Sequence, residues 1–207
     1  MKELKLVARD ISGYDYGSVE VAKSPIRLEE LQQLKASAGF TAQDEEWLHR
    51  AGSILENQTA ELVDKWRSVI SAHPHLAKYS LTVNGEKDSH YSQASGLRFQ
   101  QWVLDTCFRT YDQDWLNYQQ EIALRHTSIK KNRTDRAQSF PTIHLRDLVA
   151  FAAVINDPVI LKPFLSAKGD AEQAVDRMHQ AWCKSILLQV ALWTEPYTNT
   201  ELAPNEW

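Results

Sequence analysis

The chain has 207 residues, of which 43% are hydrophobic and 24% charged, a composition typical of a folded globular protein. Its 23 lysines and arginines stand against 27 aspartates and glutamates, so the sequence has no basic excess for binding nucleic acid. The first ten residues lack the apolar run of a secretory signal. The longest apolar stretch, 181–193, is shorter than a bilayer-spanning helix and is interrupted by Lys184 and Gln189. We therefore expect a cytoplasmic protein that binds neither nucleic acid nor a membrane.

The predicted elements are all helices, because apolar residues recur three and four positions apart and Gly and Pro fall between the periodic segments. Before Pro25 the sequence GYDYG predicts a turn-rich extension. Ser24-Pro25 is a helix-start signal. The expected helices lie, in chain order, at 25–34, 41–73 with a break near 57, 91–108, 111–126, 141–157, 158–165 and 170–194.

The last of these helices is apolar around most of its circumference, which indicates burial on more than one side. A second copy of the chain would cover such a surface, and we expect a homodimer that uses this helix and the helix around Leu148. The two cysteines, Cys107 and Cys183, are too few for a disulfide framework or a metal cluster and are predicted to be buried free thiols.

Among the seven histidines, His126 differs from the others because it continues the apolar face that Trp115, Gln119 and Ile122 define on its helix. An imidazole in an apolar interior needs either a hydrogen-bond partner or a metal. Two interpretations therefore remain open at this point: a core histidine bonded to a backbone carbonyl, or the ligand of a haem iron. No pair of histidines four residues apart and no nucleotide or hydrolase motif offers another chemistry.

Short strings along the chain resemble the protoglobin family, the single-domain relatives of globin-coupled sensors. They occur in uninterrupted order between Ile11 and Tyr197, so the resemblance covers nearly the whole chain. The strings are GYDYG (13–17), FTAQDEEWLHRAG (40–52), DKW (64–66), AHPHL (72–76), RFQQWVLDT (98–106), YDQDWLNYQQEIALRH (111–126), KKNRTD (130–135), LVAF (148–151), LKPFLSAKG (161–169), QAW (180–182) and LQVALW (188–193).

This resemblance implies an all-α, globin-like helical sandwich with an extra N-terminal helix. It also implies a division of the chain into an N-terminal extension that covers the haem (1–23), a globin domain (24–197) and a C-terminal tail (198–207). Protoglobin-like chains pair through their last helices, which agrees with the expected homodimer.

The resemblance further implies haem b as the cofactor, with His126, the residue after the LR of EIALRH, as the only protein ligand of the iron. Residues expected around the haem are then Trp66, Arg67, Arg98, Phe99, Leu148, Phe151 and Ile155. The sequence departs from the family at Arg67, where a tyrosine is usual, and at Thr127, where a second histidine is usual. The implied function is binding of oxygen, carbon monoxide or nitric oxide at a pentacoordinate iron.

Arg67 leaves the ligand chemistry open. A guanidinium beside the iron would favour anions and polarised oxygen, whereas an arginine turned to solvent or to a propionate would leave an apolar pocket. Arg98 and Arg125 are candidate partners of the propionates and are equally plausible as surface charges. Other functions that fit the sequence are a haem enzyme of peroxidase or nitric-oxide-detoxifying type, a gas sensor acting through a separate protein, and a dimerisation protein without a cofactor.

Overall fold

The computed structural model describes residues 11–198, and the regular secondary structure of this part is helical, apart from two isolated β-bridges. Eight of its helices have eight residues or more, and three are single turns. They are α1 Leu28–Ser37, α2 Ala42–Leu55, α3 Thr59–Ala72, α4 Pro74–Ala77, α5 Ser89–Phe108, α6 Gln113–Leu124, α7 Lys131–Thr134, α8 Leu145–Ile155, α9 Pro158–Leu165, α10 Glu172–Trp193 and α11 Glu195–Thr198. The expected all-α class is confirmed.

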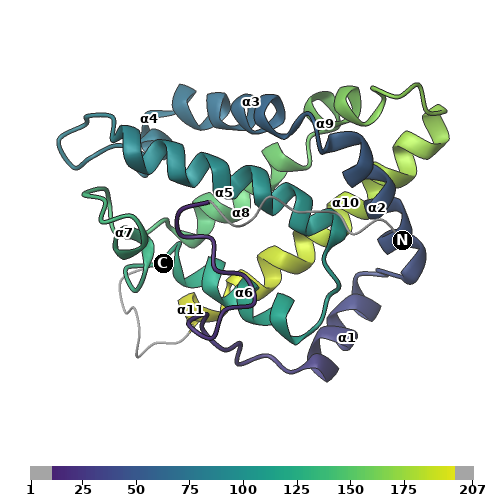
Figure 1. The fold of residues 1–207 in the computed structure, drawn as a ribbon, viewed down its shortest axis with the longest axis horizontal. Helices are drawn as coiled ribbons and strands as arrows, with labels where there is room; N and C mark the ends of the chain where they lie inside the picture. The colour runs from purple at the N-terminus through teal and green to yellow at the C-terminus, as the bar shows by residue number, and fades with distance from the viewer. Residues whose placement is uncertain (1–10, 199–207) are drawn as a thin grey trace.

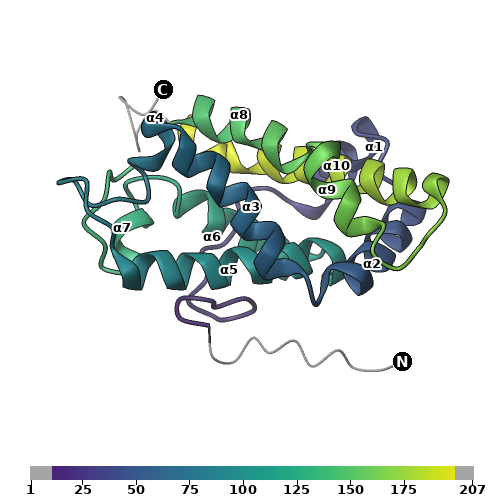
Figure 2. The same ribbon diagram turned by 90° about the horizontal axis from the view of Figure 1, so that it is seen from above.

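The two longest helices, α5 and α10, form the frame of the molecule (Figure 1). Seen from above, α5 runs along one side while α8 and α10 run along the other, and α3 crosses from one side towards the other (Figure 2). Helix α3 packs against both α5 and α8, and α10 packs against α2, α6, α8 and α9. Helices α5 on one side and α8 with α10 on the other thus form the two long sides of the molecule.

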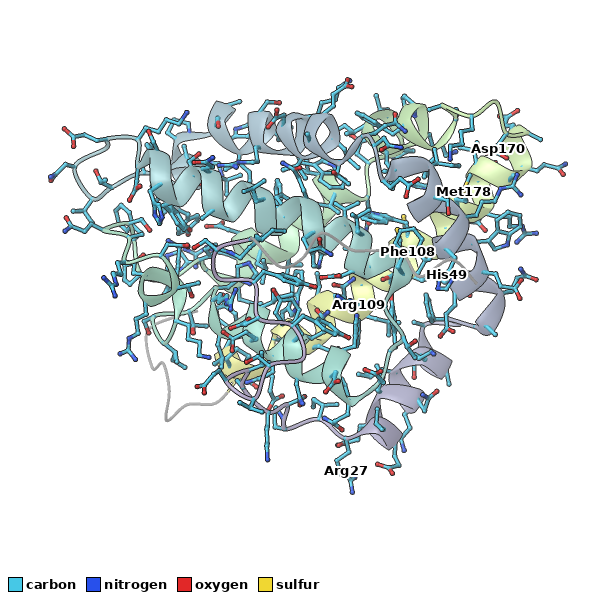
Figure 3. The ribbon with its side chains drawn as sticks, in the orientation of Figure 1. Arg27, His49, Phe108, Arg109, Asp170 and Met178 are labelled. Carbon is cyan, nitrogen blue, oxygen red and sulfur yellow. The ribbon has the colours of Figure 1, made fainter. Side chains whose placement is uncertain are left out.

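Helices α2 and α5 approach each other closely at Gly52. A methyl group at this position would lie 2.6 Å from Cβ of Cys107 and 2.6 Å from Cζ of Phe108, so only glycine fits. The Phe108 ring also lies 6.0 Å from the His49 ring (Figure 3). Cys107 is buried here as expected, whereas Cys183 is only partly buried, and both are free thiols.

The first helix begins later than the Ser24-Pro25 signal suggests. The Ser24 hydroxyl accepts a hydrogen bond from the N–H group of Ile26 at 3.1 Å and so closes a turn. The helix start falls at Arg27 instead, whose N–H donates to the carboxylate of Glu30 at 2.9 Å. A side chain that accepts from a free N–H group stabilises the first turn of a helix.

The segment before α1 folds over α5 and α6. Gly13 and Gly17, at the two ends of the GYDYG string, both have φ of 72°, which a glycine adopts without the strain that other residues meet. Between them, the rings of Tyr14 and Tyr16 lie edge-on to Tyr118 of α6, at 5.4 and 5.2 Å. Residues 1–10 of the expected extension and 199–207 of the expected tail lie outside the described residues.

The break at Asp157-Pro158 is where the sequence predicts it. The Asp157 carboxylate accepts the N–H group of Val159 at 2.8 Å and starts α9, which makes an angle of 45° with α8. Within residues 11–198 no single helix is long and apolar enough to cross a membrane, whereas the bent pair α8–α9 meets the criteria of length and composition.

The breadth of the apolar surface on α10 has an explanation within one chain. The helix is surrounded by α2, α6, α8, α9 and α11, and these neighbours bury its large side chains. Leu187, with 58% of its surface exposed, is the large apolar exception on α10. The apolar breadth of α10 therefore does not in itself require a second copy, and the homodimer stays a prediction.

Candidate functional site

A cavity of about 290 Å³ lies inside the frame of helices. One part of its wall is apolar and aromatic, with side chains from α3, α5, α6, α8 and α10. This wall consists of Ile70, Phe99, Trp102, Ile122, Ile143, Leu148, Phe151, Ile155 and Trp193. A second part is polar and comes from α5, the end of α6 and α7: Tyr91, Ser95, Arg98, Arg125, Lys131, Thr134 and Asp135. An apolar interior with one polar end suits a flat, largely apolar ligand that carries charged groups at one edge.

The structure brings most of the residues expected at the haem together around this cavity. They are Arg67, Arg98, Phe99, His126, Leu148, Phe151 and Ile155. Trp66 lies one layer behind the wall: it is fully buried, and its ring stacks on Phe99 at 5.6 Å and on Trp182 at 6.0 Å. The helical pattern placed Trp66 on an inward face, but it could not show that Phe99 lies between this tryptophan and the cavity.

The backbone around His126 differs from the expected helix. Helix α6 ends at Leu124, and His126 lies in the turn that follows, where its N–H donates to the carbonyl of Ala123 at 3.0 Å. The Thr127 hydroxyl donates to the Leu124 carbonyl at 3.0 Å and so satisfies one of the oxygens that a helix end leaves free. The carbonyl of His126 accepts from the N–H of Ile143 at 2.8 Å. The position of the histidine is thus fixed from both sides.

The imidazole of His126 is neutral at physiological pH. Its pKa is lowered to about 4, mainly by burial and in addition by the nearby cations Lys131 and Arg125. The backbone carbonyl of Ile122 acts in the opposite direction as a hydrogen-bond acceptor, although Nδ1 is buried without a partner of good hydrogen-bond geometry among the described residues. Iron binds the neutral form of a histidine, so the chemistry of this side chain fits a metal ligand.

A lone histidine cannot hold a bare metal ion firmly, and nowhere in residues 11–198 do three or more His, Cys, Asp or Glu side chains form a metal-binding group. A metal at His126 must therefore arrive with most of its ligands already in place. A porphyrin supplies four nitrogen ligands and a wide apolar surface. The aromatic walls and the polar end of the cavity match that surface and its two propionates.

Arg67 points along the edge of the cavity towards α5. Its guanidinium donates to the Ser92 carbonyl at 2.9 Å and to the Ser92 hydroxyl at 2.8 Å. It passes over Gly96, where an added methyl group would lie 2.4 Å from Nη1. Beyond it lies a second cavity of about 350 Å³, lined by polar side chains such as Ser71 and Lys87. Arg67 therefore separates the two cavities and is held on the protein rather than extended into solvent.

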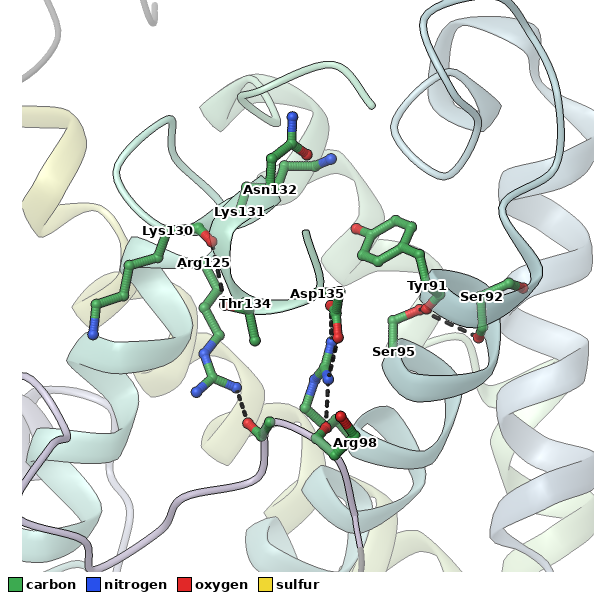
Figure 4. Close-up of polar contacts among 12 residues, drawn as sticks. Tyr91, Ser92, Ser95, Arg98, Arg125, Lys130, Lys131, Asn132, Thr134 and Asp135 are labelled. Atoms are coloured by element: carbon green, nitrogen blue, oxygen red, sulfur yellow. Dashed lines mark hydrogen bonds and ion pairs between the residues drawn. The ribbon is translucent and has the colours of Figure 1, made fainter. Parts of the chain in front are cut away.

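Arg98 and Arg125, the candidate propionate partners, already have partners of their own (Figure 4). Arg98 pairs with Asp135 at 2.9 Å and also donates to the carbonyl of Ser12 at 2.6 Å. Arg125 donates to the Gly13 carbonyl at 2.6 Å and pairs with carboxylates of α6 and of the N-terminal segment. Both arginines thus fasten the N-terminal segment to the polar end of the cavity.

Sequence reasoning missed several residues of the wall, among them Trp102, Trp193, Tyr91 and Lys131. The two tryptophans point their N–H groups at buried amides: Trp102 donates to Gln189 at 2.7 Å and Trp193 to Gln119 at 2.9 Å. A glutamine inside each apolar helical stripe was a signal that could have revealed these pairs. Lys131 gave no such signal, because it belongs to a basic stretch of the sequence, and such a stretch is expected to be exposed to solvent.

Comparison with known proteins agrees with this geometry. The protoglobin family model matches residues 28–203, and the chain belongs to the protoglobin family. The globin-like sandwich with an extra N-terminal helix, α1, is thereby confirmed, and the family is one of haem-binding globins. The comparison with curated proteins found no match.

Proposed function

We propose that this chain binds haem b through His126 and binds oxygen, carbon monoxide or nitric oxide at the open position of the iron. The observation that carries the proposal is the neutral, buried imidazole of His126, whose Nδ1 has no partner within residues 11–198, on the wall of an aromatic cavity. Membership of a haem-binding family supports the identity of the cofactor.

The residues around the cavity have separate tasks in this proposal. His126 supplies the neutral nitrogen for the iron, and its backbone is kept in place by the bond that its carbonyl accepts from Ile143 and the bond that its N–H donates to Ala123. Phe99, Phe151 and the aliphatic residues of α8 provide the apolar surface for the porphyrin and exclude water from it. The haem supplies the iron that binds the gas. Exclusion of water matters because an apolar surrounding would slow the oxidation of ferrous iron.

The alternative function is a haem enzyme in which Arg67 acts on the ligand of the iron. The position of Arg67 favours gas binding over this alternative. Its guanidinium already makes two hydrogen bonds to Ser92, and releasing it would cost both. A hydrogen bond from a charged group contributes about 1.5–3 kcal/mol. No carboxylate pairs with Arg67 among the described residues, so its charge depends on these bonds and on water.

The experiment is a titration of the purified, haem-free chain with ferric haem, followed by spectra of the ferric, ferrous and carbon monoxide forms. We expect saturation at one haem per chain, a sharp Soret band, and a further change when carbon monoxide is added to the ferrous form. A spectrum identical to that of free haem would overturn the proposal and favour a protein that works without the cofactor. A spectrum that shows two protein ligands on the iron and no response to carbon monoxide would contradict the proposal that one position of the iron is open to gas.

A further inference from the structure

Four cationic side chains line the cavity, and they differ in what already holds them. Arg98 and Arg125 are each paired with carboxylates, and Arg67 is bonded to Ser92. Lys131, the first residue of α7, has no ion pair to any residue in the described part of the chain. It is nevertheless only 2% exposed, so water does not compensate its charge.

The ammonium group of Lys131 has a donor to spare. It donates to the carbonyl of Tyr79 at 3.0 Å and to the hydroxyl of Ser139. An ammonium group carries three protons, so one is left. Nζ also lies over the face of the Tyr91 ring, 5.4 Å from its centre, which is a cation–π contact and provides no acceptor oxygen; both residues belong to the cavity wall. A buried, unpaired ammonium is costly, and burial accordingly lowers the pKa of Lys131 to about 8.

Tyr91 adds a second unused donor at the same end. Figure 4 places its ring between α5 and the segment of residues 130–135. Its hydroxyl makes no hydrogen bond to any described residue, and burial raises its pKa, so it keeps its proton. An ammonium with one unused proton and a phenol without an acceptor, at the same end of a cavity, together suit a carboxylate.

We propose that Lys131 and the Tyr91 hydroxyl bind a carboxylate of the porphyrin, and that Arg98 and Arg125 instead fasten the N-terminal segment. This inference rests on the proposed haem binding, since it needs a porphyrin in the cavity. The site requires a ligand with a carboxylate at the edge of a flat apolar body, and it discriminates against the same ring without that charge.

The test compares two porphyrins on the full chain: ferric haem and its dimethyl ester, which lacks both carboxylates. Their affinities are measured by titration for the parent chain, Lys131→Met and Tyr91→Phe. The matched control is Lys130→Met, since Lys130 is the adjacent lysine, is paired with Glu121 and does not line the cavity. Tyr91→Phe keeps the aromatic ring, so it tests the same site even if Lys131→Met does not fold. Circular dichroism shows whether each variant is folded.

We expect Lys131→Met to weaken haem binding about ten- to a hundredfold, the effect of one charge-assisted hydrogen bond, and to leave the affinity for the ester unchanged. Tyr91→Phe should weaken haem binding less and in the same selective way, and Lys130→Met should do neither. Equal losses for haem and ester, or no loss in either variant, would overturn the inference while leaving haem binding intact. A parent chain that binds neither porphyrin would overturn the proposed function as well.

Discussion

The guanidinium of Arg67 is held by Ser92, through one bond to its carbonyl at 2.9 Å and one to its hydroxyl at 2.8 Å. This pair joins α3 to α5 at the edge of the cavity, over the small surface of Gly96. Arg67 is thus part of the wall of the cavity. Its effect on bound ligands depends on whether these two bonds persist.

Arg67→Leu should therefore change the binding of different ligands by similar, small amounts. We expect the dissociation of oxygen, fluoride and carbon monoxide each to change by less than about threefold, well under the tenfold that 1.4 kcal/mol produces. The three ligands are measured side by side, because a guanidinium near the iron would act on oxygen and fluoride far more than on carbon monoxide. A selective loss of fluoride and oxygen binding would contradict the position on Ser92.

Gly96→Ala should release the guanidinium, since its methyl group would lie 2.4 Å from Nη1. A freed charge in an apolar cavity attracts anions, so fluoride should bind about tenfold more tightly to Gly96→Ala than to Gly96→Ala with Arg67→Leu. Ser92→Ala is the control, because it removes one of the two bonds and leaves the carbonyl in place. Equal fluoride affinities in the two variants would count against this role of Gly96.

The two glycines of the N-terminal segment offer a matched pair. Both have φ of 72°, so alanine meets the same backbone strain at each, about 1–2 kcal/mol. A methyl group at Gly13 would also lie 2.8 Å from Nη1 of Arg98 and 2.9 Å from Cγ2 of Thr134, whereas nothing lies within 4 Å at Gly17. We expect Gly13→Ala to lower the free energy of unfolding by about 1–3 kcal/mol more than Gly17→Ala, measured in urea. Equal costs would contradict the close packing of this segment on Arg98 and Thr134.

The stability of the haem-free chain should depend on pH through His126. Above pH 6.5 the imidazole is neutral in both the folded and the unfolded chain. Between pH 6.5 and 4 the unfolded chain takes up a proton that the folded chain does not, because burial lowers the folded pKa to about 4. The free energy of unfolding should therefore fall by about 3 kcal/mol over this range relative to His126→Leu. A constant difference between the two proteins would contradict the burial of a neutral imidazole.

A homodimer through α8 and α10 remains a prediction, and the exposed apolar residues on these helices allow a test. Val149 on α8 is 47% exposed and Leu187 on α10 is 58% exposed. The control is Leu97, 40% exposed on α5, which runs along the opposite side of the molecule (Figure 2). Val149→Asp and Leu187→Asp should give monomers in light scattering, and Leu97→Asp should not. A monomeric parent chain at every concentration would contradict the dimer.

Helical periodicity predicted much of the fold, because each helix buries one stripe of side chains and breaks at Pro or Gly. The stop at Asp157-Pro158 and the inward stripe of α8 with Leu148, Ala152 and Ile155 are examples. Periodicity failed at the end of α6. It could not show that the helix stops at Leu124, before His126, since a helix end depends on local bonds such as the one from the Thr127 hydroxyl to the Leu124 carbonyl.

Residues of the candidate site could be predicted only where the apolar stripe of a single helix shows that they face inward. Phe99, Leu148, Phe151 and Ile155 follow from apolar stripes that face inward. Lys131 and Tyr91 did not, because a buried lysine is indistinguishable in sequence from a solvated one. The second layer occupied by Trp66 depends on the packing of three helices, which a single sequence does not reveal.

The central claim is that His126 holds the iron, and the most direct measurement is the haem affinity and Soret spectrum of His126→Gly with and without added imidazole. The control is His144→Gly, since Nδ1 of His144 is also buried without a partner within residues 11–198, yet this histidine does not line the cavity. We predict that His126→Gly loses the spectrum of a histidine-bound iron, that imidazole restores it, and that His144→Gly keeps it. An unchanged spectrum in His126→Gly without imidazole would contradict the assignment.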